Sequence, residues 1–479
     1  MPIWVLATDG VIRVTLFLHV IYRRRPVSVT LAWLVLIALV PIISVVAYLM
    51  IGESRLGVHR AKQYEAFTKK LELEALKLWE ERGYLATDIL GTAQTARLGV
   101  TSGSLPAMRG SRLGLIGDDL EMLALLVQDI DAATDHVHIV TYIWTHDAGA
   151  TRVAEALIRA AKRGVVCRVL VDGVGSWKFI GGPLWCRMRE GGVNMLEALP
   201  VNWFRRPFAR VDLRNHRKIA VIDGRIGYCG SQNIHDTTFR SSKWRRTGPW
   251  IDASVRVVGP AAQALGVTFL RDWCLDTSET MTDVARYLPP LEPGAAPDQI
   301  LQVLPSGPGR TPKAIHEAVL TIIYSAREEV VMTSPYFVPD EALLSALTSA
   351  AARGVKVTVV LPHRSDSPLV AAASRSFYVD LLDAGVSIWH HMPGLLHAKT
   401  LTMDGKIGLI GSANMDARSF FLNFEATMFV YDNDFTKELL NLQQTYIAKS
   451  REIVPKRWHE RKWWEVLRDN TVQLLGPLL

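Results

Sequence analysis

Two stretches of the sequence carry the same polar side chains in the same order. They read HRKIAVIDGRIGYCGSQN at 216–233 and HAKTLTMDGKIGLIGSAN at 397–414. Aligned without gaps, the copies share a histidine, a lysine, an aspartate, a serine and an asparagine, together with one isoleucine and three glycines. A single histidine on a strand is usually a satisfied core residue. Two long matched copies in one chain instead indicate that these groups have a chemical function.

The spacing within each copy predicts that its polar groups lie side by side. Residues i and i+2 of a β-strand face the same way, so His216 and Lys218 point together. Asp223, followed by glycine, predicts a hairpin whose second strand returns Ser231 and Asn233 to the start of the motif. The second copy repeats this pattern with His397, Lys399, Asp404, Ser412 and Asn414.

An imidazole, an ammonium, a hydroxyl and an amide are the groups that bind a phosphodiester and neutralise its oxygens during displacement. If the two half-sites face one another, one histidine attacks phosphorus while the other protonates the leaving oxygen. Lys218 and Lys399 supply the positive charge, and the sequence offers no carboxylate cluster suited to two metals. We therefore expect neither a metal nor a cofactor.

The elements that position these groups also form a repeat. Strand, helix and strand patterns follow one another in VHIVTYIW, VAEALIRAAKRG and VVCRVLVDG (137–173), and again in EVVMTSPYF, ALLSALTSAAARG and VKVTVVLP (329–362). Each helix pattern ends at a glycine, Gly164 or Gly354, the usual helix-ending residue. The sequence predicts two similar α/β domains, 100–287 and 300–450, joined by the Pro/Gly-rich linker 288–299.

The duplicated H-x-K-x4-D and G-S-x-N motifs resemble those of the phospholipase D superfamily. The resemblance implies two α/β domains that share one active site, and a covalent phosphohistidine that passes to an alcohol or water. It also implies a mainly structural role for the aspartate of each motif. Acids further downstream, matched here by Asp252 and Glu425, would orient the histidines. We expect His216 to attack and His397 to act as acid and base.

Within that superfamily, the apolar N-terminus and the sequences YFVP (336–339), PWID (249–252) and MDARSFFLNFE (415–425) resemble bacterial cardiolipin synthases. That resemblance implies that two phosphatidylglycerol molecules condense to cardiolipin and glycerol. The alternative is a phospholipase D hydrolase, or a phosphatidyltransferase with another donor such as phosphatidylethanolamine. A nuclease of the same superfamily fits less well because of the membrane segment. A non-catalytic scaffold fits less well because both motifs are intact. The sequence does not indicate an oligomeric state.

Residues 1–52 are expected to anchor the chain in a membrane. Residues 27–52 contain no charge and are long enough for a transmembrane helix, with Pro41 as a kink. Residues 3–22 are expected to form a second span in which Asp9 and Arg13, one helical turn apart, can pair; the alternative is an amphipathic helix that lies in the membrane interface. A helical connector follows at 53–99. We expect a multi-pass protein of the bacterial inner membrane with cytoplasmic catalytic domains.

The composition agrees with an anionic partner. The 479 residues carry a net charge of +7, which fits anionic lipid but also nucleic acid. The membrane segment argues against nucleic acid, so an anionic membrane is the expected partner. The tail at 451–479 mixes Lys and Arg with tryptophan, which indicates either a membrane interface or a helix packed on the catalytic domain. Four scattered cysteines predict neither a zinc site nor a disulfide framework.

Overall fold

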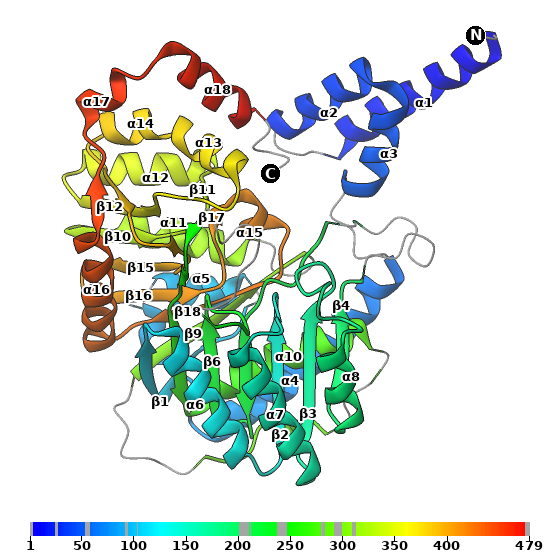
Figure 1. Cartoon of the computed structure of the whole chain (residues 1–479), viewed down its shortest axis with the longest axis vertical. Coiled ribbons are helices and arrows are strands. Elements are labelled where there is room, and N and C mark those ends of the chain that lie inside the picture. Colours follow the sequence, from blue (N-terminus) through cyan, green and yellow to red (C-terminus); the bar gives the residue numbers. More distant parts are fainter. Residues whose placement is uncertain are drawn as a thin grey trace.

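A computed structural model gives the arrangement of most of the chain (Figure 1). It describes residues 3–23, 27–52, 58–91, 94–102, 104–200, 210, 212–236, 247–277, 279, 283–291, 299–308 and 313–474. Two α/β halves lie against one another, and one sheet of 15 described strands runs through both. Of the predicted linker 288–299, residues 292–298 lie outside the described residues.

The sheet has the same strand order in both halves, counted outward from its centre. At the centre β1 (Ala107–Ile116) pairs antiparallel with β9 (Gln299–Ser306). On the side of β1 the order is β8 (Ser254–Val258), β6 (Ile226–Gly230), β5 (Ile219–Ile222), β2 (His136–Thr141), β3 (Val166–Asp172) and β4 (Asn194–Ala198). On the side of β9 it is β18 (Glu425–Val430), β16 (Ile407–Gly411), β15 (Thr400–Met403), β10 (Glu329–Thr333), β12 (Lys356–Pro362), β13 (Ser387–His391) and β19 (Ser450–Glu452).

The outer strands of each half are parallel and are connected by helices. β2, β3 and β4 are parallel, as are β10, β12 and β13. Parallel neighbours need a crossover, which α7 (Ala148–Lys162) and α12 (Glu341–Ala352) provide. Both helices end before a glycine with positive φ, 92° at Gly164 and 88° at Gly354, so the predicted helix ends are confirmed.

Two long helices cover the centre of the sheet. α10 (Pro260–Asp276) packs on β1, β5, β6 and β9, and α16 (Asn433–Ala448) packs on β10, β15 and β16. Most of the α10 side chains are buried, which explains an apolar sequence without a polar face. The core around α10 contains side chains from both halves, including Val255, Leu265 and Met428. The two halves therefore share a hydrophobic core as well as a sheet.

Shorter helices complete the two halves. In the first half these are α6 (Asp119–Ala132) and α8 (Pro183–Glu190). In the second half they are α11 (Ala314–Ser325), α13 (Pro368–Ser376), α14 (Tyr378–Asp383), α15 (Ala417–Phe421), α17 (Pro455–His459) and α18 (Trp463–Gln473). The connector contains α4 (Val58–Glu81), η1 (Thr87–Gly91) and α5 (Gln94–Thr101), and the short helix η2 (Ala285–Tyr287) precedes the linker.

The N-terminal region differs from its prediction. The expected continuous helix over 27–52 is two helices, α2 (Val27–Leu39) and α3 (Pro41–Ile51). Pro41 stands at the first turn of α3, because proline has no N–H for a helical bond and its ring clashes with the preceding turn. None of the helices within the described ranges is both long enough and apolar enough to cross a membrane.

α1 (Ile3–Tyr22) forms where a second apolar helix was expected. Asp9 and Arg13 are paired at 2.5 Å, so the predicted one-turn ion pair is confirmed. α1, α2 and α3 pack on one another around Val20, Trp33 and Tyr48. Between α1 and α2, residues 24–26 lie outside the described residues.

Candidate active site

Each histidine of the duplicated motif is bonded to an acid from the opposite half of the molecule. His216 Nδ1 lies 3.0 Å from Glu425 Oε1, and His397 Nδ1 lies 2.6 Å from Asp252 Oδ1. All four side chains are buried. Because the pairings cross the boundary between the halves, both histidines belong to one composite site. With Nδ1 bonded to a carboxylate, Nε2 of each imidazole remains for chemistry.

Backbone contacts explain the crossed pairings. The first motif enters beside the segment that carries Glu425, where Asn215 forms a bridge with Phe424 and His216 N donates to Phe424 O at 2.9 Å. The second motif enters through β14 (Leu395–Leu396), which pairs with β7 (Trp250–Ile251), and His397 N donates to Ile251 O at 2.8 Å. Each histidine is thus held next to an acid one residue further along the opposing segment.

The two lysines lie beside the histidines, as the strand spacing predicts. Lys218 Nζ donates to His216 O at 2.7 Å, and Lys399 Nζ donates to His397 O at 2.6 Å. Burial lowers the pKa of Lys218 to about 8 and that of Lys399 to about 7. A bound phosphate would keep both lysines in the ammonium form, because a nearby anion raises the pKa of an amine.

The imidazoles are held in their neutral form. Burial lowers the pKa of His216 to about 4 and that of His397 to about 3, although each has a carboxylate partner. The lysines of both halves add to this effect, since Lys399 also lowers the pKa of His216 and Lys218 also lowers that of His397. A neutral imidazole with a free Nε2 can act as a nucleophile or a base at neutral pH.

The carboxylates remain charged. Burial alone would raise the pKa of Asp252 and Glu425, but the neighbouring histidine and lysine outweigh it and lower both values. Ser231 Oγ donates to Asp252 Oδ1 at 2.5 Å, and Ser412 Oγ donates to Glu425 Oε2 at 2.5 Å. The hydroxyl protons of both serines are therefore directed at the carboxylates and not toward a substrate phosphate.

The two asparagines have unused hydrogen-bonding groups. Asn233 Oδ1 accepts from Ile143 N at 3.0 Å, while its Nδ2 is buried and has no partner among the described residues. In Asn414 the buried side-chain oxygen has no partner there either. Amide nitrogen and oxygen are assigned from their surroundings. Each asparagine can thus present an amide to a substrate.

Asp223 and Asp404 lie at the hairpin turns. Their φ angles are 51° and 50°, and the glycines that follow also have positive φ, as a tight type I′ turn requires. Asp223 accepts hydrogen bonds from the backbone amides of residues 134–136, and Asp404 accepts them from residues 327–329. These segments lead into β2 and β10, so the two aspartates hold the hairpins to the start of those strands.

A buried ion pair below the first histidine was not anticipated from the sequence. Arg217 pairs with Asp272 of α10 and also donates to Glu425 O and Ser306 O, both at 2.9 Å. Asn215 Nδ2 donates to Asp272 at 2.8 Å. The only sequence signal is an arginine inside a buried strand pattern, between the motif's His and Lys. Its partner on α10 could not be identified without the fold.

Aromatic rings line the site. The ring of Tyr142 meets that of His216 edge-on at 4.9 Å, and Lys218 Nζ lies 5.4 Å from its centre. Trp250 lies 4.4 Å from the His397 ring. Tyr336, in the segment SPYF that corresponds to TYIW of the first repeat, donates to Asp366 at 2.7 Å. The two tyrosines are one position apart within these segments, because Tyr142 matches Pro335 and Tyr336 matches Ile143.

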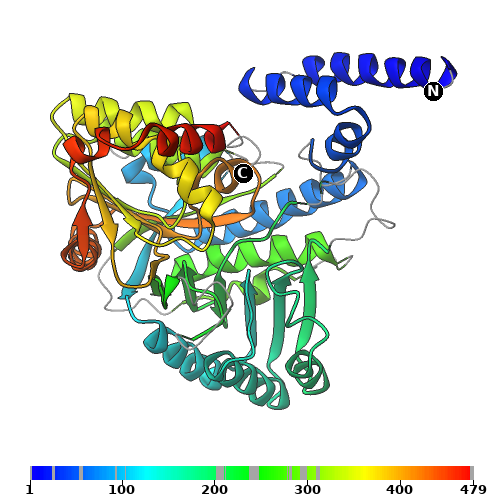
Figure 2. The ribbon, with the colours of Figure 1, turned by 45° about the horizontal axis from the view of Figure 1, so that its top comes forward.

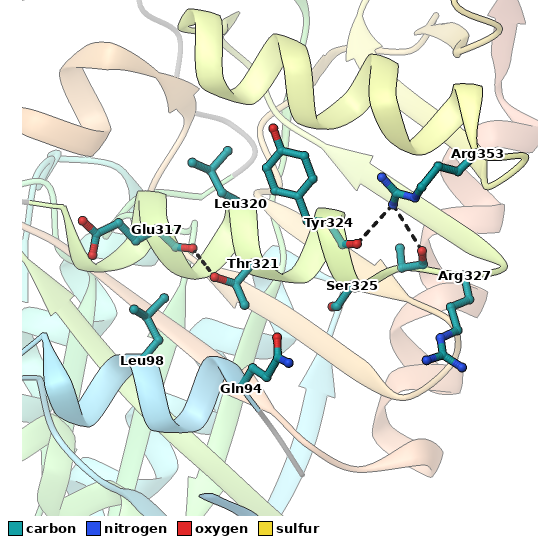
Figure 3. A pocket seen from close by; sticks show the side chains of 10 residues that line it. Gln94, Leu98, Glu317, Leu320, Thr321, Tyr324, Ser325, Arg327 and Arg353 are labelled. Atoms are coloured by element: carbon teal, nitrogen blue, oxygen red, sulfur yellow. Dashed lines mark hydrogen bonds between the residues drawn. The ribbon is translucent and has the colours of Figure 1, made fainter. Parts of the chain in front are cut away.

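A pocket of about 740 Å³ lies between α5 and α11 (Figure 3). Arg353, at its edge, donates to the carbonyls of Tyr324 and Ala326 and so caps the end of α11. In the first half Arg163 caps α6 in the same way, through the carbonyls of Ile130 and Ala133. The arginine is thus a repeated structural device. No site residue lines this pocket.

Positive charge at the candidate site comes from lysine. Across the described ranges, no three His, Cys, Asp or Glu side chains are grouped as metal ligands. What the arrangement offers is two neutral imidazoles with free Nε2 atoms, two lysines and two amides, within a buried setting. This set can bind a phosphodiester and exchange one of its ester oxygens by way of a histidine.

Comparison with known proteins agrees with the geometry. The family model "Cardiolipin synthase, PLD-like domain" matches residues 126–244 and 319–445, and the model "Phospholipase_D-nuclease N-terminal" matches residues 11–53. Cardiolipin synthase A of Erwinia tasmaniensis is 38% identical over 468 residues, which cover 96% of this chain and 95% of that protein. Cardiolipin synthase A of Serratia proteamaculans is 37% identical over the same shares.

The fold has a solved counterpart as well. The crystal structure of phosphatidylserine synthase from Haemophilus influenzae matches with a TM-score of 0.57 at 14% identity, and the match covers 80% of this chain and 99% of that one. At that identity the likeness shows the fold alone. The sequence matches extend over nearly the whole chain, and the chain belongs to the cardiolipin synthase family of phospholipase D-like proteins.

Proposed function

We propose that this chain is a phosphatidyltransferase that condenses two phosphatidylglycerol molecules into cardiolipin and glycerol. The observation that carries the proposal is the composite site, with both histidine and lysine pairs intact, in a chain 38% identical to a cardiolipin synthase A over 96% of its length. Phosphatidylglycerol is thus both donor and acceptor, and cardiolipin is the lipid product.

In the first step His216 Nε2 attacks the phosphorus of the donor lipid. The bond between phosphorus and the headgroup glycerol oxygen breaks, and His397 gives that oxygen its proton. The anionic phosphodiester supplies the negative charge that lets His397 hold a proton, since an anion close to a histidine raises its pKa. The products of this step are free glycerol and a phosphatidyl group bonded to His216.

In the second step a hydroxyl of the acceptor's headgroup glycerol attacks the same phosphorus. His397, now neutral, takes the hydroxyl proton, the bond to His216 breaks, and cardiolipin forms. The site returns to its starting protonation state, because the proton given in the first step is recovered in the second. Water competes poorly where the site excludes it, and this favours transfer over hydrolysis.

The remaining site residues support these two steps. Lys218 and Lys399 neutralise the phosphoryl oxygens, and the amides of Asn233 and Asn414 bind them. Glu425 and Asp252 fix the tautomers of their histidines. We assign Ser231 and Ser412 to holding these carboxylates, in place of the phosphate-binding role that the motif alone suggested. Asp223 and Asp404 act through the hairpins.

We also propose that residues 1–52 seat the chain in an anionic membrane. Large apolar side chains of α1 and α2 are exposed, among them Val11, Leu18, Val27 and Leu39, and exposed apolar area on this scale marks a membrane or protein contact. We propose an inner-membrane location with the catalytic halves on the cytoplasmic side.

We further propose that the rest of the chain is divided into a connector at 53–99, domains at 100–287 and 300–450, and a tail at 451–479.

Product analysis tests the function. The full chain is incubated with labelled phosphatidylglycerol in vesicles without added metal, and lipids and free glycerol are quantified. Cardiolipin with equimolar glycerol is expected. Phosphatidic acid as the main product would make the chain a hydrolase. If cardiolipin forms only when phosphatidylethanolamine is supplied, and ethanolamine is released, the donor is phosphatidylethanolamine and not phosphatidylglycerol.

A further inference from the structure

The outer face of α18 carries large side chains that remain in contact with solvent. Trp463 is 76% exposed and Leu467 is 57% exposed, and Trp464 and Leu474 are also exposed. Positions 463, 467 and 474 recur at helical spacing, so these side chains lie along one side of the helix, and Trp464 lies next to that row. We call them, together with Lys462 and Arg468, the α18 face.

The opposite side of α18 is firmly attached to the catalytic half. Asp469 is fully buried and accepts bonds from Arg375 of α13 at 2.9 Å, from Arg461 at 3.1 Å and from the half-exposed Arg468 at 2.9 Å. Before α18, Trp458 packs on Tyr378, with the Arg461 guanidinium 3.9 Å from its ring. The tail therefore turns one tryptophan inward and two outward. The exposed row belongs to a fixed helix.

The charge around the α18 face suits an anionic partner. Lys462 Nζ lies 6.0 Å and Arg468 Cζ 5.9 Å from the ring of Trp464, so two cations border the indole. The exposed charged residues of 451–474 are predominantly basic. They are Arg451, Lys456, Arg457, Lys462 and Arg468 against Glu452 and Glu460. Tryptophan bordered by long cationic side chains is typical of the level of lipid headgroups, where apolar parts enter the bilayer and charges reach the surface.

Helix α18 lies at the same end of the molecule as α1, α2 and α3 (Figures 1 and 2). α18 packs on α13, whose Leu369 is half exposed. α13 in turn packs on β11 (Phe337–Val338), which pairs with β17 (Met415–Asp416), directly after Asn414. A short series of packed elements thus connects the α18 face to the active site.

We propose that the α18 face docks on an anionic phospholipid bilayer and holds the catalytic halves at the lipid surface. This inference rests on the proposed function, since a transferase with two lipid substrates must meet both at a bilayer. The N-terminal helices tether the chain, whereas the α18 face sets how the catalytic halves sit on the bilayer. A protein surface is a poorer match, because interface cores are depleted in lysine.

The first test compares two forms of substrate. Full-length W463A/L467A is measured on phosphatidylglycerol vesicles and on short-chain phosphatidylglycerol below its critical micelle concentration. The matched control is L120A/Y324A, which removes side chains that are 44% and 50% exposed on α6 and α11. We expect at least a tenfold loss on vesicles and no loss on the monomeric substrate, with the control unchanged on both. Equal rates on vesicles, or an equal loss on both substrates, would overturn the proposal.

The second test does not depend on transferase activity. Tryptophan fluorescence of the full chain is quenched by vesicles of brominated phosphatidylglycerol, and W463F/W464F is compared with the unmodified chain. Because the other tryptophans are retained, any difference in quenching comes from α18. We expect quenching to fall in the variant, and the difference to shrink in zwitterionic vesicles.

Quenching that is the same in both chains would overturn the docking, even if cardiolipin forms. A fall in quenching in a chain without any transferase activity would keep the docking and overturn the function. A third outcome is that the two tryptophans are shielded from solvent without vesicles, and that the molecular mass in solution rises with protein concentration but falls in W463F/W464F. In that case the α18 face binds a second chain and the proposal fails.

Discussion

The two histidine half-sites use the same backbone entry and the same kind of carboxylate, but the residues that flank the histidines differ. His216 stands between Asn215 and Arg217, whose side chains reach Asp272 below the site. His397 stands between Leu396 and Ala398, which are apolar and buried. Arg217 also binds the backbone oxygen of Glu425, the acid that holds His216. The residues that flank His216 thus form a buried ion pair with Asp272, whereas Leu396 and Ala398, which flank His397, carry no side-chain charge.

This difference suggests how the two histidines of a duplicated site take different roles in the reaction. Two equal copies would give two equal histidines, yet transfer chemistry needs one that stays in place during covalent bonding and one that exchanges a proton. A network that fixes the acid partner of His216 favours this histidine as the nucleophile. The simpler apolar setting of His397 suffices for proton transfer.

Removal of either histidine has the largest expected effect. H216A and H397A should each lower the rate of transfer by at least about a thousandfold, because groups that act as one unit lose most of their effect when either is missing. Cardiolipin formation on vesicles measures this loss. An active single variant would contradict a site that needs both. A matched control is H459A, an exposed histidine on α17, which should keep full activity.

Substitution of Glu425 and Asp252 should distinguish the histidine that acts as nucleophile from the histidine that transfers the proton. E425Q and D252N each remove the carboxylate from one histidine, and we expect losses of about 10²–10⁴-fold, the usual range of general acid–base assistance. A donor lipid with a good leaving group does not need protonation. It should therefore restore the formation of the covalent intermediate in D252N but not in E425Q. Restoration in E425Q alone would reverse the assignment of nucleophile and acid.

The buried ion pair between Arg217 and Asp272 should contribute to the free energy of unfolding as well as to the rate of transfer. R217M leaves Asp272 buried without its cationic partner, with only the hydrogen bond from Asn215, and loss of one member of a buried ion pair costs about 3–5 kcal/mol. Denaturant unfolding measures this loss. At the matching position of the second half, A398S should change the free energy of unfolding by less than about 1.5 kcal/mol, because the change is small. A small effect of R217M would remove the proposed difference between the half-sites.

The pH dependence of stability has the smallest expected effect. Burial holds the pKa of His216 at about 4, below the value of an unfolded histidine. Between these two pKa values the unfolded chain binds more protons, so stability is present above the unfolded pKa and is lost as pH falls toward 4. H216N should reduce the loss between pH 7 and pH 5 by on the order of 1–2 kcal/mol. An equal loss in both proteins would contradict a buried neutral imidazole.

Much of the local structure could be predicted from the sequence, since it depends on neighbours in the chain. The turns at Asp223 and Asp404 and the helix ends at Gly164 and Gly354 follow from residue types that tolerate positive φ. The ion pair between Asp9 and Arg13 follows from one turn of helix. The duplicated motif itself predicted two similar α/β halves, and these are present.

Features that depend on distant packing were not predictable. The pairing of β1 with β9 merges the halves into one sheet, and the crossed bonds of His216 and His397 follow from that arrangement. Nothing near Arg217 in the sequence identifies Asp272 as its partner. The sequence predicts only a kink at Pro41, whereas the helix breaks there, because proline lacks the N–H that would continue the hydrogen bonds of α2.

The most direct test of the account is to locate the covalent intermediate. The full chain is mixed with phosphatidylglycerol labelled at phosphorus, stopped within the first turnover in denaturant at mildly alkaline pH, digested and mapped by mass spectrometry. The account predicts one phosphatidyl group for each chain, bonded to His216. A phosphatidyl group on His397, or on a residue outside both motifs, would contradict it.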